Sequence, residues 1–406
     1  MDGFKSEESE RGEFARDLSE RFSRHQLIEG FDQSRVSALR IAVVGAGAIG
    51  NEFIKNLLLI GVGTIDVFDY DLVEISNLTR SVFLRESDIG LNKAIAVVNR
   101  ASELYPACHL AAVPGSIFDT LSLSRAKQYD VIVAAVDNLD ARLRINEIAL
   151  ITARDWINCA IDARSTVTEV FPFRSHEKMI ACYACQLPDT VFERRAKRYS
   201  CGGLQRAAYI ENTVPTTTIT ASIVAAQGLS ELLRLVHARG GIEVGQFTAQ
   251  PFALNQSSRR FLDTLSFVAT RTVMSHHQDC ASCSFTPRNP PIEHPKNRDG
   301  LLAVISNIYK ERALHQDDVL LQLSDAIITG AACQINPQHN SVAVRGERAS
   351  QISDQVTWCE QCHDHSVTVG VHASLSLREF APLLPQIKPH AIAWITVDDT
   401  VIEFPN

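Results

Sequence analysis

The chain has 406 residues, enough for two or three domains, and its 45% hydrophobic and 21% charged residues are typical of a globular protein. The formal net charge of -8 argues against a nucleic-acid partner, because neutralising phosphates without base specificity requires clustered lysine and arginine. The polar N-terminus lacks the apolar core of a secretory signal, and no stretch has about 18 consecutive apolar residues, so we expect a cytoplasmic protein without a membrane segment.

Residues 1–35 form the first predicted unit, a charged helical segment. Its apolar residues recur at roughly helical spacing, at Phe14, Leu18, Phe22, Leu27 and Ile28. An apolar run at 40–44 then predicts a strand that ends in the turn Gly45-Ala-Gly47-Ala-Ile-Gly50. A helix at 53–60 and a strand at 64–69 follow, which completes a strand, glycine turn, helix, strand unit.

Further strands are predicted at 131–136 and 156–160, on either side of a helix at 139–152. Alternating strands and helices imply a parallel sheet covered on both faces, so the predicted fold class is α/β with a Rossmann-like doubly wound sheet. The nearly uncharged segment 215–235 predicts a buried helix. It is too polar for a membrane span, because it is interrupted by Gln227, Glu231 and Arg234.

The main domain is predicted to cover residues 36–285. A linker is predicted at 286–299, which carries four prolines and several charges. The remaining residues, 300–406, predict a smaller α+β accessory domain, because segments near its C-terminus alternate as strands do.

The glycine turn is a candidate phosphate site. Gly45, Gly47 and Gly50 let backbone amides and a helix N-terminus approach a phosphate closely. Asp69 lies 19 residues beyond Gly50, where a strand-end carboxylate can hold ribose hydroxyls. This pattern alone fits NAD as well as ATP.

The residues after the turn favour ATP. They carry carboxylates, an amide and cations within 25 residues: Asp69, Asp71, Asn77, Arg80 and Lys93. Asp137 then follows the predicted strand 131–136. Hydride transfer has no evident need for this mixture, whereas adenylyl transfer needs cations for the triphosphate and a carboxylate for Mg²⁺.

Residues 21–142 resemble the adenylation domain shared by ubiquitin-activating enzymes and by the ThiF-MoeB-type adenylyltransferases of thiamine and molybdopterin biosynthesis. The resemblance is carried by the motifs RFSRHQ, GAGAIG, DYDLVEISNLTR, GLNKA and DNLDAR, and it continues less tightly to about residue 285. It implies that Asp69 binds ribose, that Asp137 is associated with Mg²⁺, and that the motif positions Asn77, Arg80 and Lys93 belong to the ATP site. It also implies a homodimer, since Arg24 is similar to an arginine that a partner subunit inserts into that site.

Ten cysteines in a cytosolic chain indicate metal or nucleophilic chemistry more than disulfides. Two pairs about a hundred residues apart, Cys182 with Cys185 and Cys280 with Cys283, are enough for a closed tetrahedral Zn²⁺ site. The family that the chain resembles places its structural zinc in the same way. Cys108 and Cys159 have apolar surroundings and are expected in the core.

Cys201 is the candidate nucleophile. Its polar loop carries four nearby cations, Arg194, Arg195, Lys197 and Arg198, which favour the thiolate. The position is similar to the catalytic cysteine of compact ubiquitin-like activating enzymes, and only about thirty residues separate Cys185 from the helix at 215. A free surface cysteine is the alternative.

A third pair, Cys359 and Cys362, is followed by His363 and His365 and preceded by Cys333. One pair with undefined partners is a weak metal signal, so the sequence leaves a second zinc site open.

The expected function is ATP-dependent adenylation of the flexible C-terminal tail of a ubiquitin-like protein, followed by a thioester at Cys201 and transfer to a conjugating enzyme. The first alternative is an adenylyltransferase for a sulfur-carrier protein. The second, a catalytically idle binding partner, is disfavoured by the complete set of ATP-site residues. Residues 300–406 do not match a sulfurtransferase-like domain, which favours protein conjugation.

Overall fold

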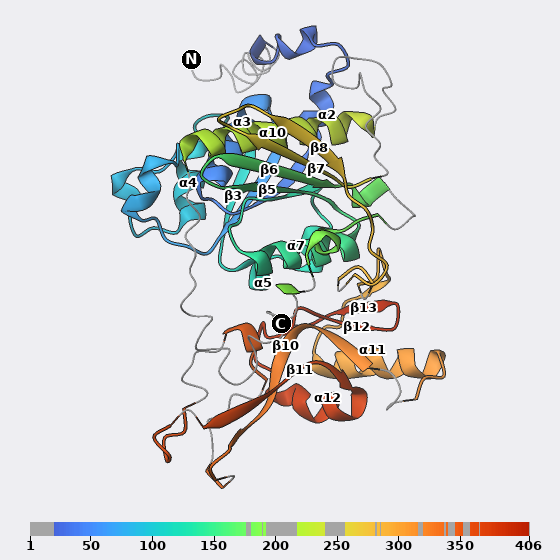
Figure 1. Ribbon diagram of the computed structural model, residues 1–406. Helices are drawn as coiled ribbons and strands as arrows, with labels where there is room; N and C mark the ends of the chain where they lie inside the picture. Colours follow the sequence, from blue (N-terminus) through green and yellow to red (C-terminus); the bar gives the residue numbers. More distant parts are fainter. Residues whose placement is uncertain are drawn as a thin grey trace, which may run out of the picture.

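The computed structural model has two β-sheets, each with its own helices (Figure 1). The structure describes residues 20–175, 180–188, 190–191, 217–239, 256–280, 282–284, 286–315, 320–336, 338–339, 346–351, 358–364 and 366–405.

The larger sheet has eight strands in the order β3-β2-β1-β4-β5-β6-β7-β8. Five are parallel: β1 (Arg40–Val44), β2 (Thr64–Asp69), β3 (His109–Pro114), β4 (Val131–Ala134) and β5 (Asp155–Ile161). Three antiparallel strands extend it: β6 (Ser165–Phe171), β7 (Ser258–Asp263) and β8 (Ala269–Val273). The predicted Rossmann-like α/β sheet is therefore confirmed. Because β2, β1 and β4 are neighbours, their carboxyl ends meet at one edge.

One face of this sheet is covered by four helices: α2 (Gln33–Ala38), α3 (Ala48–Ile60), α4 (Lys93–Ala101) and α10 (Thr218–Ala238). Leu57 of α3 and Leu232 of α10 are fully buried there. A Cβ on Gly228 would press on Phe53 and Cys159, so the glycine lets α10 lie close to α3 and β5.

The length and composition of α10 would allow it to cross a membrane, but 56% of its most apolar stretch is buried inside the protein. That burial is typical of a core helix, as predicted for this segment.

The opposite face is covered by α5 (Ile117–Thr120), α6 (Leu123–Ala126) and α7 (Leu139–Thr152). Stacked rings of Trp156 and Phe171, with centroids 4.5 Å apart, lie in this second core. Figure 1 shows α5 and α7 between the large sheet and the C-terminal domain.

The smaller sheet has the order β11-β10-β12-β13-β9. Its strands are β9 (Ile292–Glu293), β10 (Leu320–Cys333), β11 (Val367–Ser376), β12 (Trp394–Val397) and β13 (Thr400–Glu403). It packs with α11 (Arg298–Glu311) and α12 (Leu377–Leu383) around a separate core, as predicted for a small α+β unit. The segment 286–299 is not a plain linker, because it contributes β9, which pairs with β13, and the first residues of α11.

The two sheets are joined through a buried polar contact. Asp325 of β10 forms ion pairs with Arg144 of α7 and with Arg348, and all three side chains are almost fully buried. Trp394 lies under the Arg144 guanidinium at 4.6 Å and belongs to the core of the large domain. The two domains therefore share a packed interface.

The described part of the N-terminal segment is not the continuous helix that its spacing predicts. It contains the 3-10 turn η1 (His25–Leu27) and, after a break, α2. Gly30 has φ +79°, and the Asp32 carboxylate accepts hydrogen bonds from the Ser34 and Arg35 amides, which starts a new helix. Further 3-10 turns are η2 (Ile75–Thr79), η3 (Glu86–Asp88), η4 (Phe173–Ser175), η5 (Tyr183–Gln186), η6 (Ala349–Gln351) and η8 (Leu384–Gln386).

Candidate functional site

The glycine turn lies at the carboxyl edge of the large sheet, between β1 and α3. Gly45 has φ +100°, and an added Cβ there would collide with the carbonyl of Ala135 after β4. A Cβ on Gly50 would collide with the Gly45 carbonyl, whereas a Cβ on Gly47 would meet nothing within 4 Å. Gly45 and Gly50 are thus required for packing, while Gly47 leaves open space in front of the N-terminus of α3, where an anion is favoured.

Asp69, at the end of β2, is bonded into this turn. Its carboxylate accepts hydrogen bonds from the amides of Ala46 at 2.6 Å and Asp71 at 2.8 Å. Burial raises the pKa of Asp69, and the two amide hydrogen bonds and the nearby Lys93 ammonium oppose that rise. Each carboxylate oxygen keeps a lone pair for a further donor, such as a hydroxyl.

Lys93 is the first residue of α4, and its ammonium lies 2.7 Å from the Asp71 carboxylate. The position is fixed by Asn92, which caps α4 and donates from its side chain to the Asp69 carbonyl at 3.0 Å. The end of β2 and the start of α4 therefore bring a carboxylate pair and a cation to one place.

Asn77 and Arg80 lie on and just after η2. Asn77 is buried, and its side-chain oxygen accepts a hydrogen bond from the Glu74 amide at 3.0 Å, so it caps this turn. Arg80 donates to the Ser76 carbonyl at 2.6 Å. The structure gives Asn77 a conformational role, and its predicted contact with a nucleotide stays a prediction.

Asp137 is exposed and follows β4 at the same edge of the sheet as the glycine turn. The amide of Ala135 donates to the Val44 carbonyl at 2.7 Å, which holds the two strand ends together. Asn138 then caps α7 by accepting a hydrogen bond from the Ala141 amide at 2.8 Å. The carboxylate of Asp137 is thereby presented to solvent beside the turn.

Arg24 is exposed, and the contact of its neighbour Phe22 places this segment at the end of α3 away from the glycine turn. Phe22, two residues earlier, packs against Gly61, which ends α3. The 13 residues of α3 separate Gly61 from the glycine turn by about 20 Å. An arginine side chain does not span that distance.

The two widely separated cysteine pairs converge between α7 and the end of the large sheet. The sulfur of Cys182 lies 3.6 Å from that of Cys280, and the sulfur of Cys185 lies 3.8 Å from Cys182 and 3.6 Å from Cys283. Tetrahedral zinc with Zn–S bonds of about 2.3 Å places its sulfurs about 3.8 Å apart, so the four thiols fit this ion. Hydrogen bonding with Cys182 lowers the pKa of Cys280 to about 6.

Cys201 and its basic neighbours lie outside the described residues. Burial raises the pKa values of Cys108 and Cys159 to about 12, so both are poor nucleophiles. Cys333, Cys359 and Cys362 come together with His339, a residue that the sequence reasoning missed. His363 is exposed and outside this group, and His365 lies outside the described residues.

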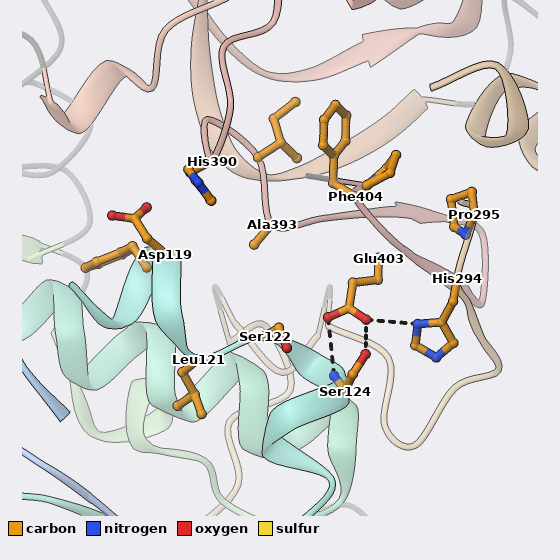
Figure 2. A pocket seen from close by; sticks show the side chains of 13 residues that line it. Asp119, Leu121, Ser122, Ser124, His294, Pro295, His390, Ala393, Glu403 and Phe404 are labelled. Atoms are coloured by element: carbon orange, nitrogen blue, oxygen red, sulfur yellow. Dashed lines mark hydrogen bonds and ion pairs between the residues drawn. The ribbon is translucent and has the colours of Figure 1, made fainter. Parts of the chain in front are cut away.

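A cavity of about 360 Å³ lies between α5, α6 and the C-terminal domain (Figure 2). Glu403 points into it, accepts hydrogen bonds from Ser124 and lies 2.8 Å from His294. Its lining contains none of the glycine-turn residues. We therefore assign the cavity to the domain interface.

The model of the ThiF family matches residues 19–391. The sulfur carrier protein adenylyltransferase of Thermus thermophilus is 32% identical over 157 residues, which are 38% of this chain and 58% of that protein. Subunit 2 of the SUMO-activating enzyme of Dictyostelium discoideum is 35% identical over 137 residues, 33% of this chain and 20% of that protein. The chain thus spans less than two thirds of these relatives.

Among solved structures, the complex of E. coli MccB with ATP covers 62% of this chain and 68% of its own, at 19% identity and a TM-score of 0.48.

Proposed function

Because the chain belongs to the ThiF family, we propose that it is an ATP-dependent adenylyltransferase that activates the C-terminal carboxylate of a small carrier protein. The observation that carries the proposal is the bonding of the strand-end Asp69 into the glycine turn, beside the pair formed by Lys93 and Asp71. The names of the relatives, a sulfur carrier protein adenylyltransferase and a SUMO-activating subunit, support this class of substrate.

The proposed ATP site uses the carboxyl edge of the large sheet. The open space at Gly47 and the N-terminus of α3 suit the triphosphate, and the free lone pairs of Asp69 suit ribose hydroxyls. Lys93 and Arg80 would neutralise phosphate charge, and the exposed Asp137 carboxylate would hold Mg²⁺, which neutralises the remaining charge.

In the proposed reaction, a carboxylate oxygen of the carrier tail attacks the α-phosphorus of ATP. The bond between the α-phosphorus and the bridging oxygen breaks, and pyrophosphate leaves with the electron pair. The protein contributes by orienting the reactants and stabilising charge, which suits a site built from strand ends and short turns. The product is an acyl-adenylate.

The finer proposal concerns the fate of this acyl-adenylate. We favour a ubiquitin-like carrier whose adenylate is attacked by the Cys201 thiolate, so that AMP leaves and a thioester forms, ready for a conjugating enzyme. Activation of a sulfur-carrier protein without this thioester is the second candidate, supported by the names of several relatives. In both cases we propose a homodimer, because Arg24 lies too far from the turn of its own chain to act there.

The test is exchange of labelled pyrophosphate into ATP in the presence of candidate ubiquitin-like and sulfur-carrier proteins. Asp137→Asn should lower the exchange rate by at least a hundredfold, because it removes a metal-binding charge without changing side-chain volume. Asp130→Asn is the matched control, since Asp130 directly precedes the amino end of β4, whereas Asp137 follows its carboxyl end. Equal rates in the two variants would overturn the proposed site.

The same assay separates the two candidates for the later step. Cys201→Ala should keep the exchange activity and lose any reductant-sensitive adduct with the carrier. An active wild-type protein that forms no adduct would favour sulfur-carrier activation.

A further inference from the structure

We propose that the far end of β10 and β11 holds a second Zn²⁺ ion, bound by Cys333, His339, Cys359 and Cys362. The four ligand atoms lie within 4.8 Å of one another. The Cys362 sulfur lies 3.6 Å from the Cys333 sulfur and 3.1 Å from His339 Nδ1, which is itself 3.6 Å from the Cys359 sulfur. With Zn–S bonds of about 2.3 Å and a Zn–N bond of about 2.0 Å, a tetrahedral ion spaces sulfurs by about 3.8 Å and sulfur from nitrogen by about 3.5 Å.

The backbone around these residues is arranged as a metal-binding turn. The amide of Asn336 donates to the Cys333 sulfur at 3.5 Å, and the Ser366 hydroxyl lies 3.3 Å from the same sulfur. Cys359 and Asp364 form a β-bridge that closes the turn bearing Cys362, and the next residue, His363, has φ +52°. Thiolates that accept amide hydrogen bonds are suitably oriented and stabilised as ligands.

The position of the group explains why an ion is needed. Among the described residues, the segment at 346–348 makes its last hydrogen bonds with β10 at Ile328, five residues before Cys333, and the strand end extends about 17 Å further. Among the described residues, the buried apolar group at this end consists of Cys333, Cys359 and Val367. So small a core does not stabilise a fold by burial, whereas zinc supplies folding free energy directly.

The donor set selects the metal. Three sulfurs and one imidazole suit Zn²⁺, whereas Mg²⁺ and Ca²⁺ require oxygen ligands. A disulfide between Cys333 and Cys362 would use two of the three thiols and give no role to His339, whose Nδ1 faces two sulfurs. The arrangement also repeats the sulfur spacing of the group formed by Cys182, Cys185, Cys280 and Cys283.

The experiment measures zinc per full-length chain by mass spectrometry after dialysis under reducing conditions. We expect two ions in the wild type, one in the double variant Cys359→Ser/Cys362→Ser, and two in the control Cys108→Ser. The variant Cys182→Ser/Cys185→Ser should also contain one ion, because it loses the ion bound by the group at Cys182 and keeps the ion bound at Cys333. The two zinc sites are thereby measured independently of each other.

A second variant, His339→Cys, tests the same site even if the double variant does not fold. His339→Cys should retain two ions, because four thiolates bind zinc as well as three with an imidazole. After replacement by Co²⁺, the charge-transfer absorption from thiolates should rise by about one part in seven, since the two groups together hold seven cysteines and the variant adds an eighth. The proposal is overturned if the double variant contains as much zinc as the wild type, if the Co²⁺ absorption does not change in His339→Cys, or if the protein dialysed with reductant still contains a disulfide between Cys333 and Cys362.

Discussion

The two sheets are covered on both faces along their inner strands and differ at the ends of β10 and β11 near Cys333. The eight-stranded sheet has a core on each face, with α3, α4 and α10 on one side and α5 to α7 on the other. In the smaller sheet, the inner strands are also covered on both faces, since Trp394 faces the large domain and the adjacent Ile395 faces its own core. Near Cys333, the described residues at the ends of β10 and β11 form only a small separate buried group of Cys333, Cys359 and Val367.

The two cysteine groups, at Cys182 and at Cys333, therefore have different structural roles. The group at Cys182 joins segments 98 residues apart and lies within a core that contains Trp156 and Tyr183. The group at Cys333 joins residues 29 apart, and in the described part of the chain its buried apolar neighbours are limited to Val367. One set of thiols should therefore govern the cooperative stability of a domain, and the other should govern the order of one strand end.

The largest expected effect is a loss of global stability in a variant of the Cys182 group. Cys280→Ser should lower the free energy of unfolding of the large domain by more than about 4 kcal/mol, because loss of a structural metal belongs to the small class of severe changes. Cys359→Ser should leave that quantity nearly unchanged and remove amide-exchange protection only near 329–333 and 367–371. Thermal unfolding by calorimetry and hydrogen exchange by mass spectrometry measure the two effects.

Equal loss of global stability in the two cysteine variants would contradict the contrast, because both groups would then belong to one cooperative unit. Cys108→Ser is the matched control, since this thiol is partly buried outside both groups.

The next effect concerns the contact between the domains. Asp325→Asn leaves Arg144 buried without a charged partner, and breaking such a buried pair costs about 3 kcal/mol. We expect the C-terminal domain to unfold at a lower temperature than the large domain, as a separate calorimetric transition. Asp398→Asn removes an exposed ion pair with Arg312 and should leave a single transition. A single transition in Asp325→Asn would mean that apolar contacts such as those of Trp394 are enough to couple the domains.

Much of the large domain was predictable because its signals are local. The helix 139–152 begins at a capping asparagine and coincides with α7, and the buried helix predicted at 215–235 overlaps α10. The glycine spacing, together with Asp69 and Lys93, predicted the crowded end of β2 that the structure contains. Each of these features depends on residues close together in sequence.

The missed features depend on distant contacts or on a single turn. Strands β6, β7 and β8 were not predicted. The edge strand β8 is exposed along its length and carries Arg271, so its pattern is weak, and β6 and β7 pair with each other from segments far apart in the sequence. His339 was missed because the pairing of Cys333 with Val367, and not spacing, brings it to the third cysteine pair. The break before α2 was missed although Gly30 and Asp32 signal it.

The smallest expected effect tests the glycine turn itself by comparing two of its residues. Gly50→Ala should lower the free energy of unfolding by about 2 kcal/mol, because the new Cβ meets the Gly45 carbonyl and the start of α3 must shift. Gly47→Ala should change stability by less than about 1 kcal/mol, since its Cβ enters open space. If that space receives a triphosphate, Gly47→Ala should still weaken Mg·ATP binding at least tenfold in a titration calorimeter. Unaltered ATP affinity in Gly47→Ala, with the fold intact, would place the phosphates away from this turn, and the packing role of Gly45 and Gly50 would then be the whole reason for the motif.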